Sequence, residues 1–118
     1  MRPLAIAFVA ALVPAGPASA HAFLDHAEPP VGSSMREAPR QLSLWFTENL
    51  EPAFSGVTVT DAQGRAVNAG KAQVDRHDRK LMHVPLKTLG PGSYRVNWHV
   101  LSVDTHRTQG NYSLTVGR

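Results

Sequence analysis

The sequence contains no cysteine among its 118 residues. A small exported domain often depends on disulfides, so without them a fold of this size must be held together by packing alone. The missing thiols also exclude metal sites built on thiolates. Thioether ligands are scarce as well, because after Met1 the chain carries only Met35 and Met82. Any metal site in this chain must therefore be built from nitrogen and oxygen donors.

A long apolar run is missing too. The longest covers residues 4–13, whereas a membrane-spanning helix needs about 20 apolar residues. Arg2 precedes this run, and residues 14–20 (PAGPASA) end in small residues, which is the pattern of a secretory signal peptide cleaved after Ala20. We expect a signal peptide at 1–20 and one exported, periplasmic domain at 21–118 that is not embedded in the membrane. An uncleaved anchor or a buried helix is the alternative interpretation.

The sequence also has no extended concentration of charges of one sign. Twelve lysines and arginines stand against nine aspartates and glutamates, and the basic residues are scattered apart from Arg76, Arg79 and Lys80. A protein that follows a phosphate backbone gathers its basic side chains on one face or along one helix. Nucleic acid is therefore not expected as a partner.

Helical periodicity is absent after residue 20, and glycine and proline separate short segments in which apolar and polar residues alternate. Such alternation predicts strands. The expected strands are residues 23–28, 41–46, 56–61, 71–74, 80–86, 94–101 and 111–116, whereas residues 29–39 are expected to form turns. About seven short strands predict an all-β Greek-key sandwich or barrel. Phe46, Trp98 and Leu114 are predicted to lie in its core.

Six histidines are available as nitrogen donors. His77 lies in a charged loop and is expected to be solvated. His83 and His99 alternate with the apolar residues of their strands, which favours a structural role on a sheet surface for each. His26 follows His21 by five residues, and an odd separation along a strand sends two side chains to opposite faces, so we do not expect these two to share a site.

Asp104 and His106 form a D-x-H pattern. In an extended segment, residues two apart project to the same side with α-carbons about 6.5 to 7 Å apart. A carboxylate and an imidazole placed in this way can converge on one ion. Taken alone, the pattern is weak, because an aspartate and a histidine at this spacing commonly make an ordinary hydrogen bond.

A processed His21 changes the interpretation. After cleavage at Ala20, the α-amine and the imidazole of His21 can close a chelate ring on one metal ion, so the second donor binds without a further loss of translational freedom. His106 would add a third nitrogen and Asp104 an anionic oxygen. Such a set suits tetragonal Cu(II), whereas Zn(II) prefers a tetrahedron and Cu(I) prefers sulfur. The residue types therefore favour Cu(II).

The sequence resembles the periplasmic copper-resistance proteins of CopC type over essentially the whole of residues 21–118. The resemblance is carried by five features in a fixed order. These are the histidine after the signal peptide, the turn EPPVGS (residues 28–33), the strand end LWFTENL (44–50), the segment GSYRVNW (92–98) and the motif SVDTH with its following glycine (102–106 and 110).

This resemblance implies a cupredoxin-like or immunoglobulin-like β-sandwich that binds Cu(II) through His21, Asp104 and His106. Glu48 matches the glutamate at the strand end of the family, which implies an outer-shell acceptor that orients His21 or its amine. The family is often encoded beside a CopD-type inner-membrane protein, which is therefore a candidate partner. The chain departs from the family at Arg107, where a proline is frequent.

A methionine-rich segment, which gives some family members a second site for Cu(I), has no counterpart between residues 57 and 84. We therefore expect one Cu(II) site and no Cu(I) site. The expected function is storage, buffering or delivery of periplasmic copper in resistance or homeostasis, without catalysis. The alternatives are a copper-dependent oxidative enzyme of the lytic polysaccharide monooxygenase type, and a β-sandwich binding module without a metal.

Overall fold

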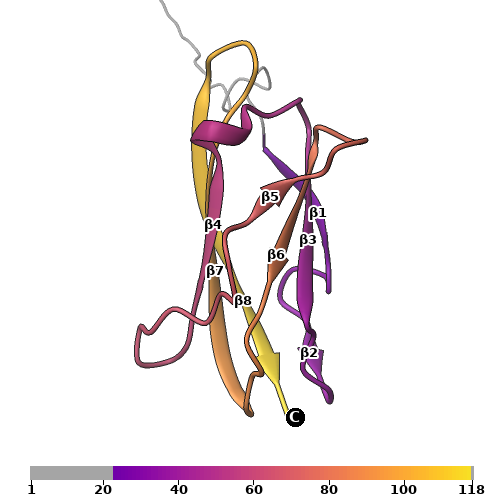
Figure 1. Cartoon of the computed structure of the whole chain (residues 1–118). Helices are drawn as coiled ribbons and strands as arrows, with labels where there is room; N and C mark the ends of the chain where they lie inside the picture. Colours follow the sequence, from indigo (N-terminus) through magenta and orange to yellow (C-terminus); the bar gives the residue numbers. More distant parts are fainter. Residues whose placement is uncertain (1–22, 118) are drawn as a thin grey trace, which may run out of the picture.

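The computed structural model describes residues 23–117, which form two four-stranded sheets packed face to face (Figure 1). The predicted signal peptide and His21 lie outside the described residues. The strands are β1 (Leu24–Glu28), β2 (Ser34–Met35), β3 (Gln41–Phe46), β4 (Gly56–Thr60), β5 (Gln73–Val74), β6 (Leu81–Pro85), β7 (Gly92–Leu101) and β8 (Arg107–Val116). A single 3₁₀ turn, η1 (Pro52–Phe54), precedes β4. The expected all-β sandwich is confirmed.

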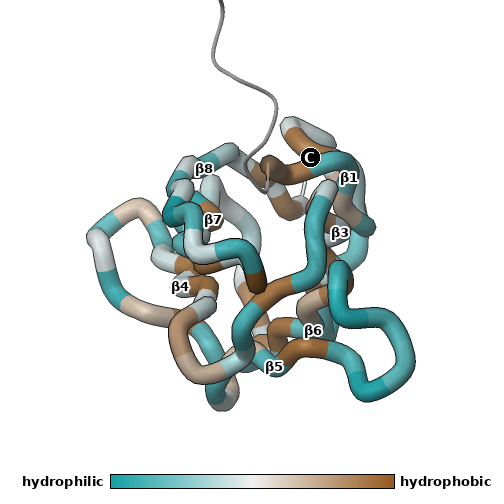
Figure 2. The backbone as a smooth tube through the Cα atoms, turned by 90° about the horizontal axis from the view of Figure 1, so that it is seen from above, coloured by the Kyte–Doolittle hydropathy of each residue, from teal (hydrophilic) through white to brown (hydrophobic). Residues whose placement is uncertain are grey.

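The sheets combine strands that are distant in the sequence. One sheet has the order β1-β3-β6-β5 and is antiparallel throughout. The other has the order β2-β8-β7-β4, in which β2 runs parallel to β8. Figure 2 shows the two sheets from one end, with β4, β7 and β8 facing β1, β3, β5 and β6. Within residues 23–117, no helix has the length and apolar character needed to cross a membrane.

Most strands differ from their expected bounds by one or two residues, and β8 and β2 differ more. β8 begins at Arg107 instead of residue 111, because its pairing with β7 continues to the end of that strand, where Leu101 pairs with Arg107. This segment has no alternating apolar pattern, and Gly110 disfavours a strand, but the long hairpin pairs it nevertheless. β2 lies in the segment that was expected to form turns. Its two residues are held against β8 by backbone bonds such as Gly117 N to Met35 O, at 2.7 Å.

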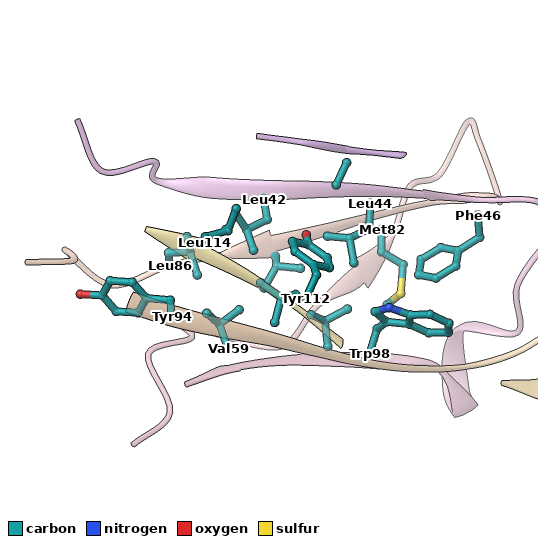
Figure 3. Close-up of a cluster of buried hydrophobic side chains, with 14 of the residues drawn as sticks. Leu42, Leu44, Phe46, Val59, Met82, Leu86, Tyr94, Trp98, Tyr112 and Leu114 are labelled. Carbon is teal, nitrogen blue, oxygen red and sulfur yellow. The ribbon is translucent and has the colours of Figure 1, made fainter. Parts of the chain in front are cut away.

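The core between the sheets contains the three residues predicted for it. Phe46, Trp98 and Leu114 are 2%, 8% and 3% exposed. Phe46 reaches Trp98 across the core in an edge-to-face contact with ring centroids 5.3 Å apart, a favourable aromatic geometry. Figure 3 shows Met82 beside this pair. These aromatic side chains therefore pack in the core, as the alternating pattern predicted.

The first prediction concerns Gly110, which pairs with Trp98 across the β7–β8 ladder. A Cβ atom at Gly110 would lie 2.5 Å from Cζ2 of Trp98, so Gly110→Ala must displace the indole. Overpacking of this kind costs about 1–3 kcal/mol. We expect a lower free energy of unfolding in urea titrations. Gly90→Ala is the matched control, because a Cβ atom there meets nothing within 4 Å. Equal stability of the two variants would contradict the prediction.

Candidate metal centre

Residues 102–106 form the turn that joins β7 to β8. The turn is closed by two backbone bonds, from Ser102 N to His106 O at 3.0 Å and from Thr105 N to Ser102 O at 2.8 Å. Thr105 has a φ of +73°, a conformation that β-branched residues rarely adopt. The chain reverses here, so Asp104 and His106 lie on a turn and not on an extended strand. Their side chains nevertheless come together, with His106 Nδ1 at 3.3 Å from Asp104 Oδ1.

Ser102 contacts the Asp104 side chain and the His106 backbone. Ser102 is fully buried, and its hydroxyl donates a hydrogen bond to Asp104 Oδ1. Ser102 Oγ also accepts a hydrogen bond from His106 N at 3.3 Å. The bond from Ser102, more than the nearby His106, holds the pKa of Asp104 below its usual value. The side chains of Asp104 and His106 are 51% and 44% exposed. The turn therefore presents an ionised carboxylate and an imidazole together at the surface.

The segment after β3 pairs with this turn. Val103 N donates to Asn49 O at 3.0 Å, Glu51 N donates to Leu101 O at 2.8 Å, and Leu50 forms a β-bridge with Ser102. This pairing places half-buried Glu48 on the strand end beside the turn. In the part of the chain that the structure describes, the Glu48 carboxylate makes no hydrogen bond to Asp104 or His106. Its predicted role as an outer-shell acceptor stays a prediction.

The beginning of the described chain is attached to the same segment. Phe23 N donates to Thr47 Oγ1 at 2.9 Å, and Thr47 N donates to Phe23 O at 2.9 Å. Phe23 therefore stands beside the residue that precedes Glu48. Figure 1 shows the start of β1, η1 and the β7–β8 turn at the same end of the sandwich, opposite the C-terminus.

The described residues contain no cluster of three or more possible metal ligands from histidine, cysteine, aspartate and glutamate. Asp104 and His106 are thus brought together as a pair. A metal bound at this turn would find no third side chain from this set among residues 23–117. The donors present are an imidazole nitrogen and a carboxylate oxygen, which suit Cu(II) or Zn(II) better than Cu(I).

The remaining described histidines are structural or lie on other surfaces. His26 stacks on Trp45 with ring centroids 4.4 Å apart and approaches Asp25 Oδ2 at 2.7 Å. His83 Nε2 contacts Asp75 Oδ1 at 2.8 Å, which agrees with the structural role predicted for it. His77 is exposed in its loop, as predicted. His99 is exposed on the outer face of β7.

Asp75 and His83 stabilise the loop that supports the site, a role that sequence reasoning missed. Asp75 Oδ2 accepts bonds from His77 N and Asp78 N, which shapes the loop between β5 and β6. The bond to His83 is the main cause of the lowered pKa of Asp75. The far end of this loop then binds the end of β3 and the segment after it, through Phe46 N to Lys80 O and Leu50 N to Arg79 O.

Ser102 was also missed as a supporting residue. A serine two positions before an aspartate does not reveal from sequence that its hydroxyl will be buried and shared between the aspartate and the histidine. The available signal was its place directly after the long alternating strand, where a small polar residue is suited to begin a tight turn.

The structure therefore defines a small all-β domain that presents an aspartate and a histidine together on a turn at one end of the sandwich. The family model described as CopC domain matches residues 24–117. The chain belongs to the CopC family, which confirms the resemblance found in its motifs.

Individual relatives agree with this assignment. The chain is 39% identical over 98 residues to Protein YobA of Escherichia coli strain K12, which covers 82% of this chain and 79% of the relative. CopC from Methylosinus trichosporium OB3b matches with a TM-score of 0.76 at 31% identity, over 81% of this chain and 93% of that one. PcoC, a methionine-rich copper resistance protein from Escherichia coli, matches with a TM-score of 0.71 at 36% identity, over 82% and 99% of the two chains.

The second prediction concerns the support from Ser102. In Ser102→Ala the Asp104 carboxylate loses its strongest hydrogen bond, so its pKa should rise toward the value of about 3.9 found in model peptides. A carboxylate with a lowered folded pKa stabilises the fold above its unfolded pKa, and this contribution disappears as the pH falls through the folded pKa. The variant should therefore lose less stability on acidification between about pH 5 and pH 2.

The measurement is an NMR titration of the Asp104 carboxyl carbon in the metal-free protein, together with unfolding at both ends of that pH range. Ser113→Ala is the matched control, because Ser113 is exposed on β8. An unchanged Asp104 titration in Ser102→Ala would show that the serine does not stabilise the carboxylate.

Proposed function

We propose that the protein is a periplasmic copper carrier that binds one Cu(II) ion through His21, Asp104 and His106. One observation carries the proposal. The turn at 102–106 holds Asp104 and His106 together, and Phe23 is hydrogen-bonded to Thr47 in the segment that pairs with this turn. Phe23 follows His21 by two residues. Two residues of extended chain span at most about 7 Å. This attachment supports a site that His21 can complete.

The proposed donor set includes both nitrogens of a processed His21. Cleavage after Ala20 would remove the signal peptide and free the α-amine, so that the amine, the His21 imidazole and His106 supply three nitrogens and Asp104 supplies an oxygen. Cu(II) favours such a tetragonal nitrogen and oxygen set. Glu48 would act from the neighbouring strand end by accepting a hydrogen bond from His21 or its amine.

The methionines of this chain support a single Cu(II) site without a Cu(I) site. Met82 is fully buried in the core, and Met35 packs against the core from β2. Met82 is therefore closed to a metal ion, and Met35 alone, half-buried on β2, offers no cluster of thioethers for Cu(I). In this respect the chain differs from its methionine-rich relative PcoC. A protein of this kind stores, buffers or passes on Cu(II) and does not move copper between two sites of its own.

The proposed biological role is copper resistance or homeostasis, without catalytic turnover. The copper resistance relatives support this role, and a CopD-type inner-membrane protein is the proposed acceptor or donor. Asp104 would occupy a coordination position that an oxygen-activating enzyme needs for its substrate. This arrangement favours carriage of the ion over oxidation chemistry.

The third prediction tests the amine. Retaining Ala20 ahead of His21 converts the amine into an amide, which cannot act as the same chelating donor. The loss of the linked donor should weaken Cu(II) binding by roughly 10²–10⁴-fold, the range typical of tethered ligands. The measurement is a competition titration with a chromophoric chelator, with intact mass spectrometry to verify the first residue. Equal affinity of the two forms would place the copper elsewhere.

The fourth prediction ranks the two donors of the turn. His106→Ala removes an equatorial nitrogen and should weaken Cu(II) binding by more than about 100-fold, beyond the range typical of outer-shell partners. Asp104→Ala should have a smaller effect, because water can replace the carboxylate oxygen. His77→Ala is the control, since His77 is exposed in a loop outside the proposed site. Electron paramagnetic resonance should show fewer nitrogen couplings in His106→Ala alone.

A further inference from the structure

The outer face of the β2-β8-β7-β4 sheet is hollowed around His99. Three adjoining depressions meet at this residue, and the largest has a volume of about 470 Å³. The hollow exists because β4 places Gly56 opposite His99, and the imidazole occupies the space of the missing side chain. A Cβ atom at Gly56 would lie 2.8 Å from the ring. We call this area the His99 surface and define it by Phe54, Thr58, Lys71, His99, Arg107 and Gln109.

The charged side chains of the His99 surface are all cationic. Lys71 and Arg107 both line it, and the residues around the three depressions include no aspartate or glutamate. Within residues 23–117, neither cation has a salt-bridge partner, and both are exposed. Several carboxylates elsewhere on the chain are already paired, as in Asp75 with His83 and Asp61 with Arg65. The His99 surface thus offers two unpaired cations to an anionic group from outside the chain.

An apolar contact accompanies these charges. Phe54 in η1 is 57% exposed and lines two of the three depressions, next to Arg107 in both. An exposed phenyl ring beside unpaired cations and a hydrogen-bonding floor of Thr58 and Gln109 fits the usual composition of a protein-binding patch, in which an aromatic anchor is surrounded by polar groups. A small inorganic anion would use the cations and leave the ring uncovered.

The His99 surface also adjoins the turn of the candidate metal centre. Arg107 directly follows His106 in the chain, and Leu101 N donates a hydrogen bond to Ser55 Oγ in the segment after η1, at 3.1 Å. Figure 1 shows η1 close to the β7–β8 turn. A protein that covers the His99 surface would therefore stand at the edge of the copper site.

We propose that the His99 surface is the docking surface for the protein that exchanges copper with this chain, and that the partner presents an acidic segment with an apolar side chain. Carboxylates of the partner pair with Lys71 and Arg107, and its apolar side chain packs on Phe54. The identification of the partner as a copper-exchanging protein rests on the proposed function. The recognition chemistry of the surface does not, since it involves no metal ligand.

The test uses the metal-free exported chain, so its outcome does not depend on copper binding. The probe is the acidic peptide acetyl-DELED-amide, added in an NMR titration of backbone amides at about 20 mM salt, where charge pairing is weakly screened. We expect shifts concentrated at Phe54, Lys71, His99, Arg107 and Gln109. The peptide acetyl-DESED-amide should bind at least about 3-fold more weakly, because it lacks the apolar side chain.

Charge reversal provides the matched variants. Lys71→Glu with Arg107→Glu should weaken binding of the acidic peptide at least about 10-fold. Arg40→Glu with Lys87→Glu makes the same change in net charge on exposed residues at the opposite end of the sandwich and should leave the affinity nearly unchanged. Phe54→Ala should remove the preference for the peptide with leucine. This last variant keeps the test valid if the charge-reversed protein does not fold.

Three outcomes would overturn the proposal. Shifts spread over the surface, or an equal loss of binding in both charge-reversed variants, would indicate attraction to net charge alone. The same local shifts with inorganic phosphate at the same concentration would indicate a small-anion site. Local shifts that depend on protein concentration without peptide would indicate that a second copy of the chain covers the surface. A separate Cu(II) titration of each variant distinguishes these failures from a failure of the proposed copper site.

Discussion

The hydrogen bonds that close the turn between Ser102 and His106 are the constraint on which the candidate metal centre depends. An aspartate and a histidine two positions apart on a flexible loop would spend little time together, and ordering them on a metal would cost conformational entropy. Here the long β7–β8 hairpin fixes both ends of the turn, and the buried Ser102 hydroxyl fixes the carboxylate. The fold therefore orders the turn before a metal binds, so less conformational entropy is lost on binding.

Segments that are distant in the sequence hold this turn in place. The segment from Thr47 to Glu51 contacts the turn, the start of β1 and the loop between β5 and β6. That loop is shaped by Asp75, whose carboxylate binds two backbone amides and His83. Elements from four regions of the chain thus meet at one end of the sandwich. The core pair Phe46 and Trp98 joins the two sheets in the interior.

The sequence predicted the fold well because alternating strands bury one face each, and this pattern is local. Phe46, Trp98 and Leu114 were placed in the core for that reason, and they are buried. The short β2 could not be predicted, because it depends on pairing with the distant β8. The early start of β8 depends on its pairing with the preceding strand β7 and not on an alternating pattern of its own residues. Asp104 and His106 were expected to approach each other on an extended segment, but a turn brings them together instead.

The parts of the site that depend on distant contacts were not available from the sequence. Nothing near Asp75 in the chain indicates that its carboxylate supports the segment carrying Glu48. The hollow on the outer face likewise arises from a glycine on β4 lying opposite a histidine on β7, a pairing that only the sheet register reveals.

The complete burial of Met82 has a consequence for a protein of a copper-related family. The sulfur of methionine is a common target of reactive oxygen species, and the attack requires access to it. The chain has no cysteine, and Met82 is sealed inside the hydrophobic core, so Met35 is the described sulfur with partial access to solvent. A metal ion held at the β7–β8 turn would also have no thiol of this chain beside it to supply an electron.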